Sequence, residues 1–328
     1  MVGDKIMKEK KLRIAVVGVG YLGRFHAEKY ARMDDVELVG VADLNKSQAE
    51  AVAQSLKTRA YTDYRDLLGK VDAVSVVTPT SLHHEVSRAF LQSDADVLIE
   101  KPVTTTLGEA QELIELAESR GLLIQVGHLE RFNPAVAALK EMMVHPPLFI
   151  ESHRLSVFKN RCTDVSVVLD LMIHDIDIIL NLVPFKIKRI QASGAPVVCP
   201  SVDIANARLE FANGCVANIT ASRISMKNER KIRFFQKDAY ISVDFANREI
   251  TRIAKDESAV DAVIPGMGIN RRCFTNADPL DDELKSFVRC VRRREVPEVT
   301  GQMGRDALKI ALSIMDQIEA SIRRFRRT

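Results

Sequence analysis

The chain has 328 residues, of which 46% are hydrophobic and 28% charged, and its formal net charge is +3. Because one hydrophobic core rarely holds a chain of this length, we expect two domains. The 47 basic and 44 acidic side chains nearly cancel, which leaves no broad cationic field for nucleic acid or a membrane surface. No apolar run reaches the roughly 18 residues of a membrane span, and the charged residues 1–11 are unlike a signal peptide.

The cysteines indicate a reducing compartment. Five of them lie far apart and form no C-x-x-C pair, namely Cys162, Cys199, Cys215, Cys273 and Cys290. An odd and scattered set is unlike a disulfide framework or a zinc site. We therefore expect a cytoplasmic protein with no metal site.

Short apolar runs alternate with helical patterns over the first 127 residues. The runs are short and β-branched, as buried parallel strands are, and they lie at 12–19, 36–42, 71–77, 97–99 and 122–126. Helices are expected between them, at 21–33, 47–57, 82–92 and 106–121. Two of these helices begin with capping boxes, Ser47-x-x-Glu50 and Thr106-x-x-Glu109. This alternation predicts right-handed βαβ units and a parallel sheet.

Beyond Gly127 the expected strands are longer and amphipathic. Ala205, Ala207, Leu209 and Phe211 point to one side and the intervening polar residues to the other, before an Asn-Gly hairpin turn at 212–214. We expect a mostly antiparallel sheet, preceded by a helix over 165–182 and closed by a helix over 305–324. The fold class is therefore α/β, with one parallel and one mostly antiparallel domain.

A glycine-rich loop joins the first strand to the first helix. Gly18-Val19-Gly20-Tyr21-Leu22-Gly23 matches G-x-G-x-x-G. In this context Gly18 permits a tight turn, Gly20 lets the backbone approach a pyrophosphate, and Gly23 lets the helix pack closely. The amides at the helix N-terminus would then bind the phosphates. The alternative is a glycine turn that only joins strand to helix.

An acidic residue follows at the position where such loops need one. Asp43 lies 20 residues after Gly23, at the end of the second expected strand. Its carboxylate would bind the ribose hydroxyls of the cofactor and repel a 2′-phosphate, which favours NAD over NADP. Lys46 would weaken that preference without reversing it. The order of strand, glycine loop, helix, second strand and acidic residue predicts a Rossmann NAD-binding domain over residues 1–127.

Glu100-Lys101-Pro102 follows the expected strand at 97–99. Lys101 should therefore project from the carboxyl edge of the sheet, where ligands bind in open α/β folds. Pro102 restricts the backbone of its neighbour. A solvated surface lysine is the simpler alternative, and the residues alone favour it.

Asp170, His174 and Asp177 have helical spacing within an otherwise apolar segment. A carboxylate one turn from an imidazole can fix its tautomer and orientation, as a general base requires. An ordinary polar helix face is an equally good explanation of the pattern by itself.

Taken together, these motifs resemble those of the glucose–fructose oxidoreductase, inositol dehydrogenase and MocA (Gfo/Idh/MocA) family. The matching segments are Gly18 to Gly23, Thr78-Pro79-Thr80 with His83, Glu100-Lys101-Pro102, Gly127-His128 with Arg131-Phe132-Asn133-Pro134, and Asp170 with His174. The resemblance implies a Rossmann domain over 1–127, followed by a substrate-binding and oligomerisation domain over 128–328 that is built on a large, mostly antiparallel open sheet.

The resemblance also implies a site. In the family, the lysine of Glu-Lys-Pro and the Asp-x-x-x-His pair face the nicotinamide from opposite domains, so Lys101, Asp170 and His174 become the catalytic residues. Either Lys101 or His174 could be the base. The implied NAD-binding residues are Gly18, Gly20, Tyr21, Leu22, Gly23, Asp43, Thr78, Pro79, His83, Glu100 and Lys101.

Within the family, residues 127–134 are similar to those of bacterial UDP-N-acetylglucosamine 3-dehydrogenases. This implies that hydride passes to NAD from the 3-hydroxyl carbon of a UDP-N-acetylhexosamine. The expected substrate-binding residues are His128, Arg131, Asn133 and Arg154. Cations for the diphosphate could be Arg131, Arg154, Lys159 or Arg161.

Other functions stay open on the sequence. The same family supports inositol or simple-sugar oxidation, imine reduction and redox-assisted glycoside cleavage, and a non-catalytic NAD-binding regulator would need the glycine loop alone. The expected partner is a small-molecule sugar, together with further copies of this chain, because an open sheet is seldom left uncovered and would form a homodimer or homotetramer.

Overall fold

The computed structural model describes residues 10–158, 165–259 and 264–325. The chain divides into two compact units. The first comprises Met1–Gly127 and Leu280–Arg305, and the second His128–Pro279 and Asp306–Thr328. The break after Gly127 lies where the sequence predicts it.

The C-terminal end divides differently from the prediction, because residues 280–305 lie with the first unit. The cause is helix α7 (Pro279–Arg293), which the sequence reading missed. Its apolar face, with Leu284, Phe287, Val288 and Val291, is buried in the hydrophobic core of the first unit. Apolar burial therefore returns this segment to the first unit after the second sheet is complete.

Six parallel strands form the sheet of the first unit, in the order β3-β2-β1-β4-β5-β6. They are β1 (Leu12–Val17), β2 (Val36–Ala42), β3 (Arg59–Tyr61), β4 (Ala73–Val76), β5 (Asp96–Glu100) and β6 (Ile124–Gly127). This is the Rossmann strand order, and the predicted parallel sheet is confirmed. The short β3 lacks an apolar run, which is why the sequence reading missed it.

Four helices connect these strands, and they are α1 (Tyr21–Tyr30), α2 (Lys46–Leu56), α3 (His83–Gln92) and α4 (Leu107–Arg120). The capping box of α4 is present, since Thr106 and Glu109 exchange both hydrogen bonds. The capping box predicted at Ser47 is wrong. Asn45 caps α2 instead, accepting the amide N–H of Gln48 at 3.3 Å, because Asn45 is the last residue with extended backbone before the helix.

Eight strands form the sheet of the second unit, in the order β14-β13-β12-β11-β7-β10-β9-β8. They are β7 (Phe149–Leu155), β8 (Ile187–Ala195), β9 (Ile204–Phe211), β10 (Val216–Ser222), β11 (Glu229–Gln236), β12 (Ala239–Asp244), β13 (Glu249–Lys255) and β14 (Met267–Cys273). Only β7 and β10 pair in parallel within this described sheet. The predicted antiparallel sheet and its β9–β10 hairpin are therefore confirmed.

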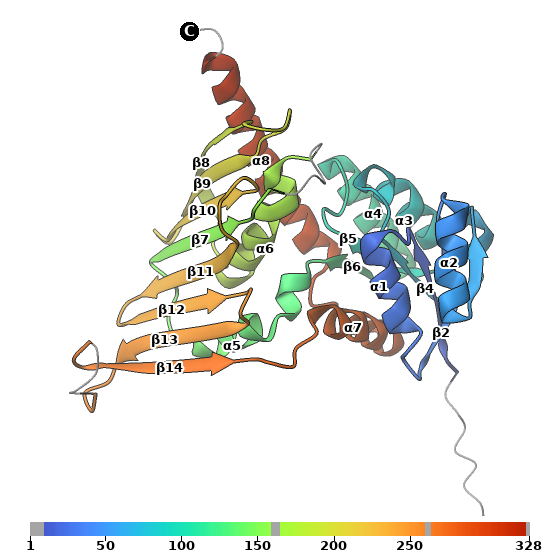
Figure 1. The fold of residues 1–328 in the computed structure, drawn as a ribbon, viewed down its shortest axis with the longest axis horizontal. Helices are drawn as coiled ribbons and strands as arrows, with labels where there is room; N and C mark the ends of the chain where they lie inside the picture. The colour runs from blue at the N-terminus through green and yellow to red at the C-terminus, as the bar shows by residue number, and fades with distance from the viewer. Residues whose placement is uncertain (1–9, 159–164, 260–263, 326–328) are drawn as a thin grey trace, which may run out of the picture. The chain divides into compact units, whose positions relative to one another are not determined.

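Three helices cover one face of this sheet, namely α5 (Pro134–Met142), α6 (Ile173–Leu182) and the second-unit part of α8 (Gly301–Phe325) (Figure 1). Leu139, Ile176 and Ile314 of these helices share one core with the strand residues Leu209 and Ile219. The alternation of β9 matches this arrangement, since Ala205, Ala207, Leu209 and Phe211 are buried and the polar residues between them are not. The predicted helices at 165–182 and 305–324 correspond to α6 and α8.

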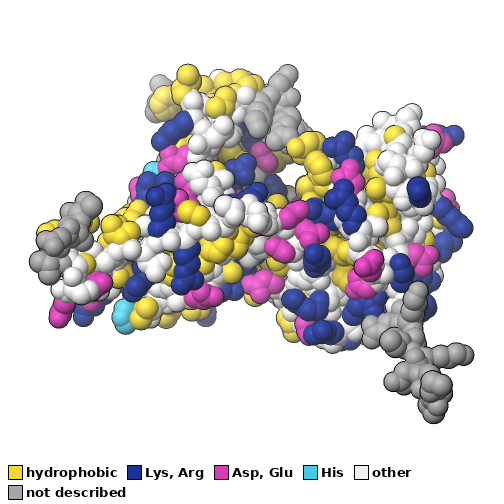
Figure 2. Space-filling model, turned by 60° about the horizontal axis from the view of Figure 1, so that its bottom comes forward, with side chains coloured by type: hydrophobic (Ala, Val, Ile, Leu, Met, Phe, Trp, Pro, Cys, Tyr) yellow, Lys and Arg dark blue, Asp and Glu magenta, His cyan; other side chains and the backbone are white. Residues whose placement is uncertain are grey.

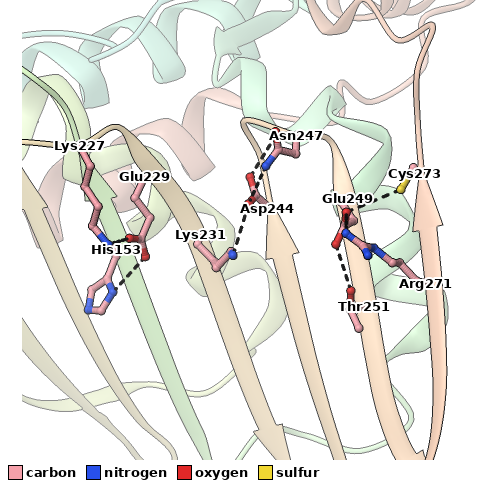
Figure 3. A network of polar contacts seen from close by, with 10 residues as sticks. All are labelled: His153, Lys227, Glu229, Lys231, Asp244, Asn247, Glu249, Thr251, Arg271 and Cys273. Atoms are coloured by element: carbon pink, nitrogen blue, oxygen red, sulfur yellow. Dashed lines mark hydrogen bonds and ion pairs between the residues drawn. The ribbon is translucent and has the colours of Figure 1, made fainter.

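The other face of the sheet carries polar side chains. Contacts there join His153 and Lys227 to Glu229, Lys231 to Asp244, and Arg271 to Glu249 (Figure 3). On the molecular face drawn in Figure 2, basic and acidic side chains are interspersed, in keeping with the balanced composition. Among the described residues, no helix is both long enough and apolar enough to span a membrane.

Candidate active site

The glycine loop has the geometry that a dinucleotide requires. Gly18 has φ +85°, and a Cβ on it would lie 2.6 Å from the Val77 carbonyl oxygen, while a Cβ on Gly23 would lie 1.8 Å from the Gly18 oxygen. Neither position accepts another residue. At Gly20 the nearest atom to a Cβ would be 3.7 Å away, on the Gln48 side chain. Open space beside Gly20 leaves its backbone accessible to a pyrophosphate at the N-terminus of α1.

Asp43 is held in place at the end of β2. Its Oδ2 accepts the Val19 N–H and its Oδ1 accepts the Asn45 N–H, both at 2.9 Å. Each carboxylate oxygen retains a lone pair for ribose hydroxyls. Lys46 is exposed and its ammonium lies 3.8 Å from Glu50, so an acidic partner already offsets its charge. This arrangement fits NAD.

A cavity of about 410 Å³ lies at the same edge of the sheet. Four of the predicted cofactor residues line it, namely Gly18, Asp43, Thr78 and Pro79. The sequence reading missed Leu44, Tyr64, Arg65, Leu82 and Glu85, which also line it. Leu44, directly after the predicted Asp43, was the available signal, because an exposed leucine at a strand end offers an apolar surface for a planar base.

His83 is buried rather than open to the cavity. Its Nδ1 lies 2.9 Å from the Pro102 oxygen and its Nε2 lies 2.9 Å from the Thr78 oxygen. Burial lowers the pKa of His83, although both carbonyls oppose that shift. The ring therefore ties the loop after β4 to the loop after β5, and it supports the predicted cofactor residues from behind.

Lys101 lies at the carboxyl end of β5, half-buried, and its bond to Pro102 is cis. The Lys101 amide donates to Glu100 Oε2 at 3.2 Å. Glu100 was predicted to bind the cofactor, yet its side chain is buried, with Oε1 3.3 Å from His26 Nε2. The buried Glu100 side chain therefore holds the backbone of Lys101 from inside the domain.

In the second unit, the Asp170–His174 segment is not a uniform α-helix. Residues Val168–Met172 form a π-helical turn that contains Asp170, and His174 lies in the first turn of the following α6. Turns of this kind occur often at functional sites. Asp170 and His174 are half-buried, whereas Asp177, predicted on the same stripe, is buried. The π-helical turn alters the winding between Asp170 and His174, whereas His174 and Asp177 stay three residues apart in the regular helix α6.

The predicted substrate residue His128 lies beside His174. Their ring centroids are 6.2 Å apart and the rings are nearly perpendicular. His128 is buried at the start of a short 3₁₀ turn (Leu129–Phe132). The structure therefore brings together two histidines that are 46 residues apart in the sequence.

Arg154 is the centre of a buried ionic network in the second unit. Its Nε and Nη2 donate to the two oxygens of Asp175, and its Nη1 donates to Glu130, all at 2.9 Å. Arg131 Nη1 lies 3.5 Å from Asp177 Oδ1. Burial lowers the pKa of Arg154, but Asp175 and Glu130 together raise it above its ordinary value. This network fastens β7, α6 and the 3₁₀ turn to one another.

These contacts bear on the predicted substrate residues. Arg131 and Arg154 already face carboxylates in the interior, so a diphosphate would have to displace those partners. Asn133 is buried as the N-cap of α5 and accepts the Ala135 N–H at 3.1 Å. An Asn-Pro pair before an apolar helix is the usual N-terminal signal, and the sequence reading passed over it. Lys159 and Arg161 lie outside the described residues.

The sequence reading missed the structural roles of Glu130 and Asp175. Asp175 adjoins His174 within an apolar helix, and a buried acid there requires a cation. That requirement was visible in the sequence, but its partner on β7 was not.

Comparison with known proteins decides the family. A model described as an oxidoreductase family with an NAD-binding Rossmann fold matches residues 12–128, and one described as the GFO/IDH/MocA C-terminal domain matches residues 151–242. The chain belongs to the Gfo/Idh/MocA family. It is an NAD-dependent oxidoreductase, as the glycine loop and Asp43 predict.

Two relatives show where the chain lies within the Gfo/Idh/MocA family. A UDP-N-acetylglucosamine 3-dehydrogenase of Acidithiobacillus ferrooxidans is 38% identical over 313 residues, which cover 95% of this chain and 99% of that protein. A scyllo-inositol 2-dehydrogenase (NAD(+)) of Bacillus subtilis is 28% identical, with coverage of 89% and 90%.

A solved structure of UDP-N-acetylglucosamine 3-dehydrogenase from Acidithiobacillus ferrooxidans has a TM-score of 0.90 to this chain at 38% identity, and covers 94% of this chain and 98% of its own. Levoglucosan dehydrogenase in complex with NADH shares the fold, with a TM-score of 0.83 at 16% identity and coverage of 95% and 98%.

Proposed function

We propose that this protein oxidises the 3-hydroxyl of a UDP-N-acetylhexosamine and passes the hydride to NAD. The observation that supports the substrate is the 38% identity to a UDP-N-acetylglucosamine 3-dehydrogenase along nearly the whole length of both chains. The inositol dehydrogenases among the relatives match with lower identity.

The chain offers the groups that such a reaction needs. His174 removes the hydroxyl proton, Asp170 orients the imidazole, and Lys101 stabilises the alkoxide that develops on the sugar oxygen. Bound NAD supplies the hydride acceptor. Lys101 and His174 could exchange roles, because a lysine shielded from water can also serve as the base. The Arg154 network supports this chemistry by fixing α6, which carries His174, beside His128.

Incubation with NAD and UDP-N-acetylglucosamine should produce NADH, measured by its absorbance. Where equilibrium favours the alcohol, an aminotransferase with an amino donor draws the reaction forward by consuming the ketone, and nitrogen at C3 of the product confirms the position. NADH formed with free inositol or glucose, and never with UDP-sugars, would move the assignment to the inositol and simple-sugar dehydrogenases.

Replacing either catalytic residue should abolish most turnover. We expect Lys101→Ala and His174→Ala each to lower kcat by on the order of 10²-fold or more, with a much smaller change in NAD affinity. His84→Ala is the matched control, because His84 lies on the surface of α3 and pairs with Glu112. Near-normal turnover by His174→Ala at neutral pH would remove His174 as the base.

Asp43→Ala should weaken NAD binding and reduce the preference for NAD over NADP, since it removes the group that repels a 2′-phosphate. Asp34→Ala, which removes an exposed carboxylate outside the cavity, is the control. Titration of both cofactors by fluorescence gives the dissociation constants. Tighter binding of NADP than NAD by the unmodified protein would contradict the assignment.

The polar face of the eight-stranded sheet is the proposed interface between copies of this chain, as a homodimer or a pair of dimers. At one end it carries three aromatic rings. The ring centroids of Phe149 and Phe235 are 5.6 Å apart, and those of Phe235 and Tyr240 are 5.1 Å apart. Aromatic residues are enriched in the cores of protein–protein interfaces, and polar groups surround those cores. A light-scattering mass near the 36.6 kDa of one chain at micromolar concentration would count against it. The cytoplasmic location stays a prediction from the cysteine pattern.

A further inference from the structure

Three ionisable side chains are buried together in the first unit, behind the Glu-Lys-Pro turn. Glu100 ends β5, His26 lies on α1, and Glu283 lies near the start of α7. His26 and Glu283 are 0% exposed and Glu100 is 8% exposed. None of the three has a role in the reaction as described above, yet Glu100 contacts Lys101 directly.

No described residue offers Glu283 a hydrogen bond that would stabilise a negative charge. Within the described residues, neither of its carboxyl oxygens has a hydrogen-bond partner, and Gln125 donates to its backbone oxygen, at 3.2 Å. An ionised carboxylate in such surroundings is strongly disfavoured, and the group keeps its proton instead. Burial raises the pKa of Glu283 well above its ordinary value, and the charge of Glu100 raises it further.

Glu100, in contrast, has partners for its charge. Its Oε1 lies 3.3 Å from His26 Nε2, and its Oε2 accepts the Lys101 N–H at 3.2 Å. Burial by itself would raise the pKa of Glu100, but His26 and Lys101 outweigh it and lower the pKa. A Cβ on Gly127 would lie 2.9 Å from the Glu100 carboxyl group, so the β6 backbone confines that group from the other side.

We propose that Glu283 is a positioning residue for Lys101. It stays protonated beside the ionised Glu100, so that the two acids hold one negative charge between them, and that single charge fixes the Lys101 amide through Glu100. A second negative charge would break this arrangement by repulsion. The proposal rests on the proposed function only for the catalytic role of Lys101.

The arrangement implies a weakness at alkaline pH. A buried acid whose pKa is raised stabilises the fold below the pKa of the unfolded chain, and that stability is lost as the pH rises through the raised pKa. The other ionisable groups around the pair are His26 and Tyr30 of α1, His83 of α3, and Lys101 directly after β5. Tyr30 is buried and bonded to Ser75 at 2.9 Å, and burial and Glu283 raise its pKa, so it stays neutral in this range.

The first test needs no substrate. Glu283→Gln keeps the size and neutrality of a protonated acid. We therefore expect the Tm of the variant to exceed that of the unmodified protein increasingly as pH rises from about 5 to about 9. The infrared carbonyl band of a buried carboxylic acid should be present in the unmodified protein at neutral pH and absent from the variant. Asp282→Asn, an exposed acid in the same helical turn, is the control and should change neither measurement.

The second test separates positioning from a purely structural role. Glu283→Gln should retain kcat within about twofold at neutral pH and lose less of it than the unmodified protein on the alkaline side. Glu283→Ala should lower kcat by on the order of 10-fold, with the KM for NAD changed by less than about twofold. If Glu283 acts as a neutral side chain of fixed size, glutamine should restore activity and alanine should not.

Several outcomes would overturn the proposal. The first is that Tm depends on pH in the same way in Glu283→Gln and in the unmodified protein. The second is that the substitution removes no infrared carbonyl band. The third is that the glutamine variant does not fold. If the infrared and Tm results hold but no sugar is oxidised, the proposed function fails and the acid pair stands.

Discussion

Two consecutive residues of β7 show how the faces of the second sheet differ. His153 lies 3.7 Å from Glu151 and 3.5 Å from Glu229 on the polar face, where its side chain is 32% exposed. Arg154 lies 2.9 Å from Asp175 and from Glu130 on the helix-covered face, where its side chain is 4% exposed. The same combination of one base and two acids therefore occurs on both faces, in different surroundings.

The difference in burial gives the two clusters different roles. Exposed ion pairs contribute about 0–1 kcal/mol because water and salt screen them. In the interior, removal of one partner leaves an uncompensated charge and costs about 3–5 kcal/mol. The Arg154 network can therefore hold α6 in place, whereas the ion pairs of the polar face add little to the stability of the chain.

The largest expected effect comes from Arg154→Ala. The change leaves Asp175 and Glu130 buried without their cation, so we expect the free energy of unfolding to fall by about 3–5 kcal/mol. Urea denaturation of the purified variant measures this. Arg154→Met combined with Asp175→Leu should cost less than the sum of the two single changes, because the double variant leaves fewer buried charges unpaired. Strict additivity would show that the network is not coupled.

An intermediate effect is expected at Asp203, a buried carboxylate whose charge is stabilised by hydrogen bonds from backbone amides. It accepts the N–H groups of Val197, Val198 and Cys199 at 2.9, 2.6 and 2.9 Å. Burial would raise its pKa, but these bonds outweigh burial and lower the pKa to about 2.

Because this pKa is depressed, the stability from Asp203 is present above the pKa of the unfolded chain and is lost as pH falls from about 4 towards about 2. Asp203→Asn should therefore lower the free energy of unfolding by about 2 kcal/mol at neutral pH and reduce its loss in acid. Denaturant titrations at several pH values test this. If the variant loses as much of its free energy of unfolding in acid as the unmodified protein does, the prediction is contradicted.

The smallest effect is expected for Arg233→Ala on the polar face. Arg233 lies 2.7 Å from Glu151 and its side chain is 28% exposed. We expect a loss of at most about 1 kcal/mol, and less at high salt. A loss as large as that of Arg154→Ala would break the comparison, because it would mean that another copy of the chain covers this face. Measurement at several protein concentrations separates the two cases.

Much of the first unit could be predicted from short stretches of sequence. The glycine loop, the Thr106 capping box and the acidic residue at the end of β2 each follow from backbone geometry within a few residues. The alternation of β9 and β10 similarly identified their hairpin. The site was less predictable. Arg131, Arg154 and Asn133 have residue types that suit a substrate, but their type does not reveal whether a helix, a carboxylate or solvent faces them.

Sequence patterns were enough to predict the NAD-binding loop, a parallel sheet followed by an antiparallel one, and the family. These predictions depend on the spacing of hydrophobic residues within short segments and on glycines that no other residue can replace. Three-dimensional packing was needed to show that α7 returns to the first unit, that Gln125 contacts Glu283 across 158 residues, and that Arg154 faces Asp175 of α6 and Glu130 of the 3₁₀ turn. Such pairs form because apolar surfaces must be buried together, and a burial partner distant in the chain leaves no pattern in the neighbouring residues.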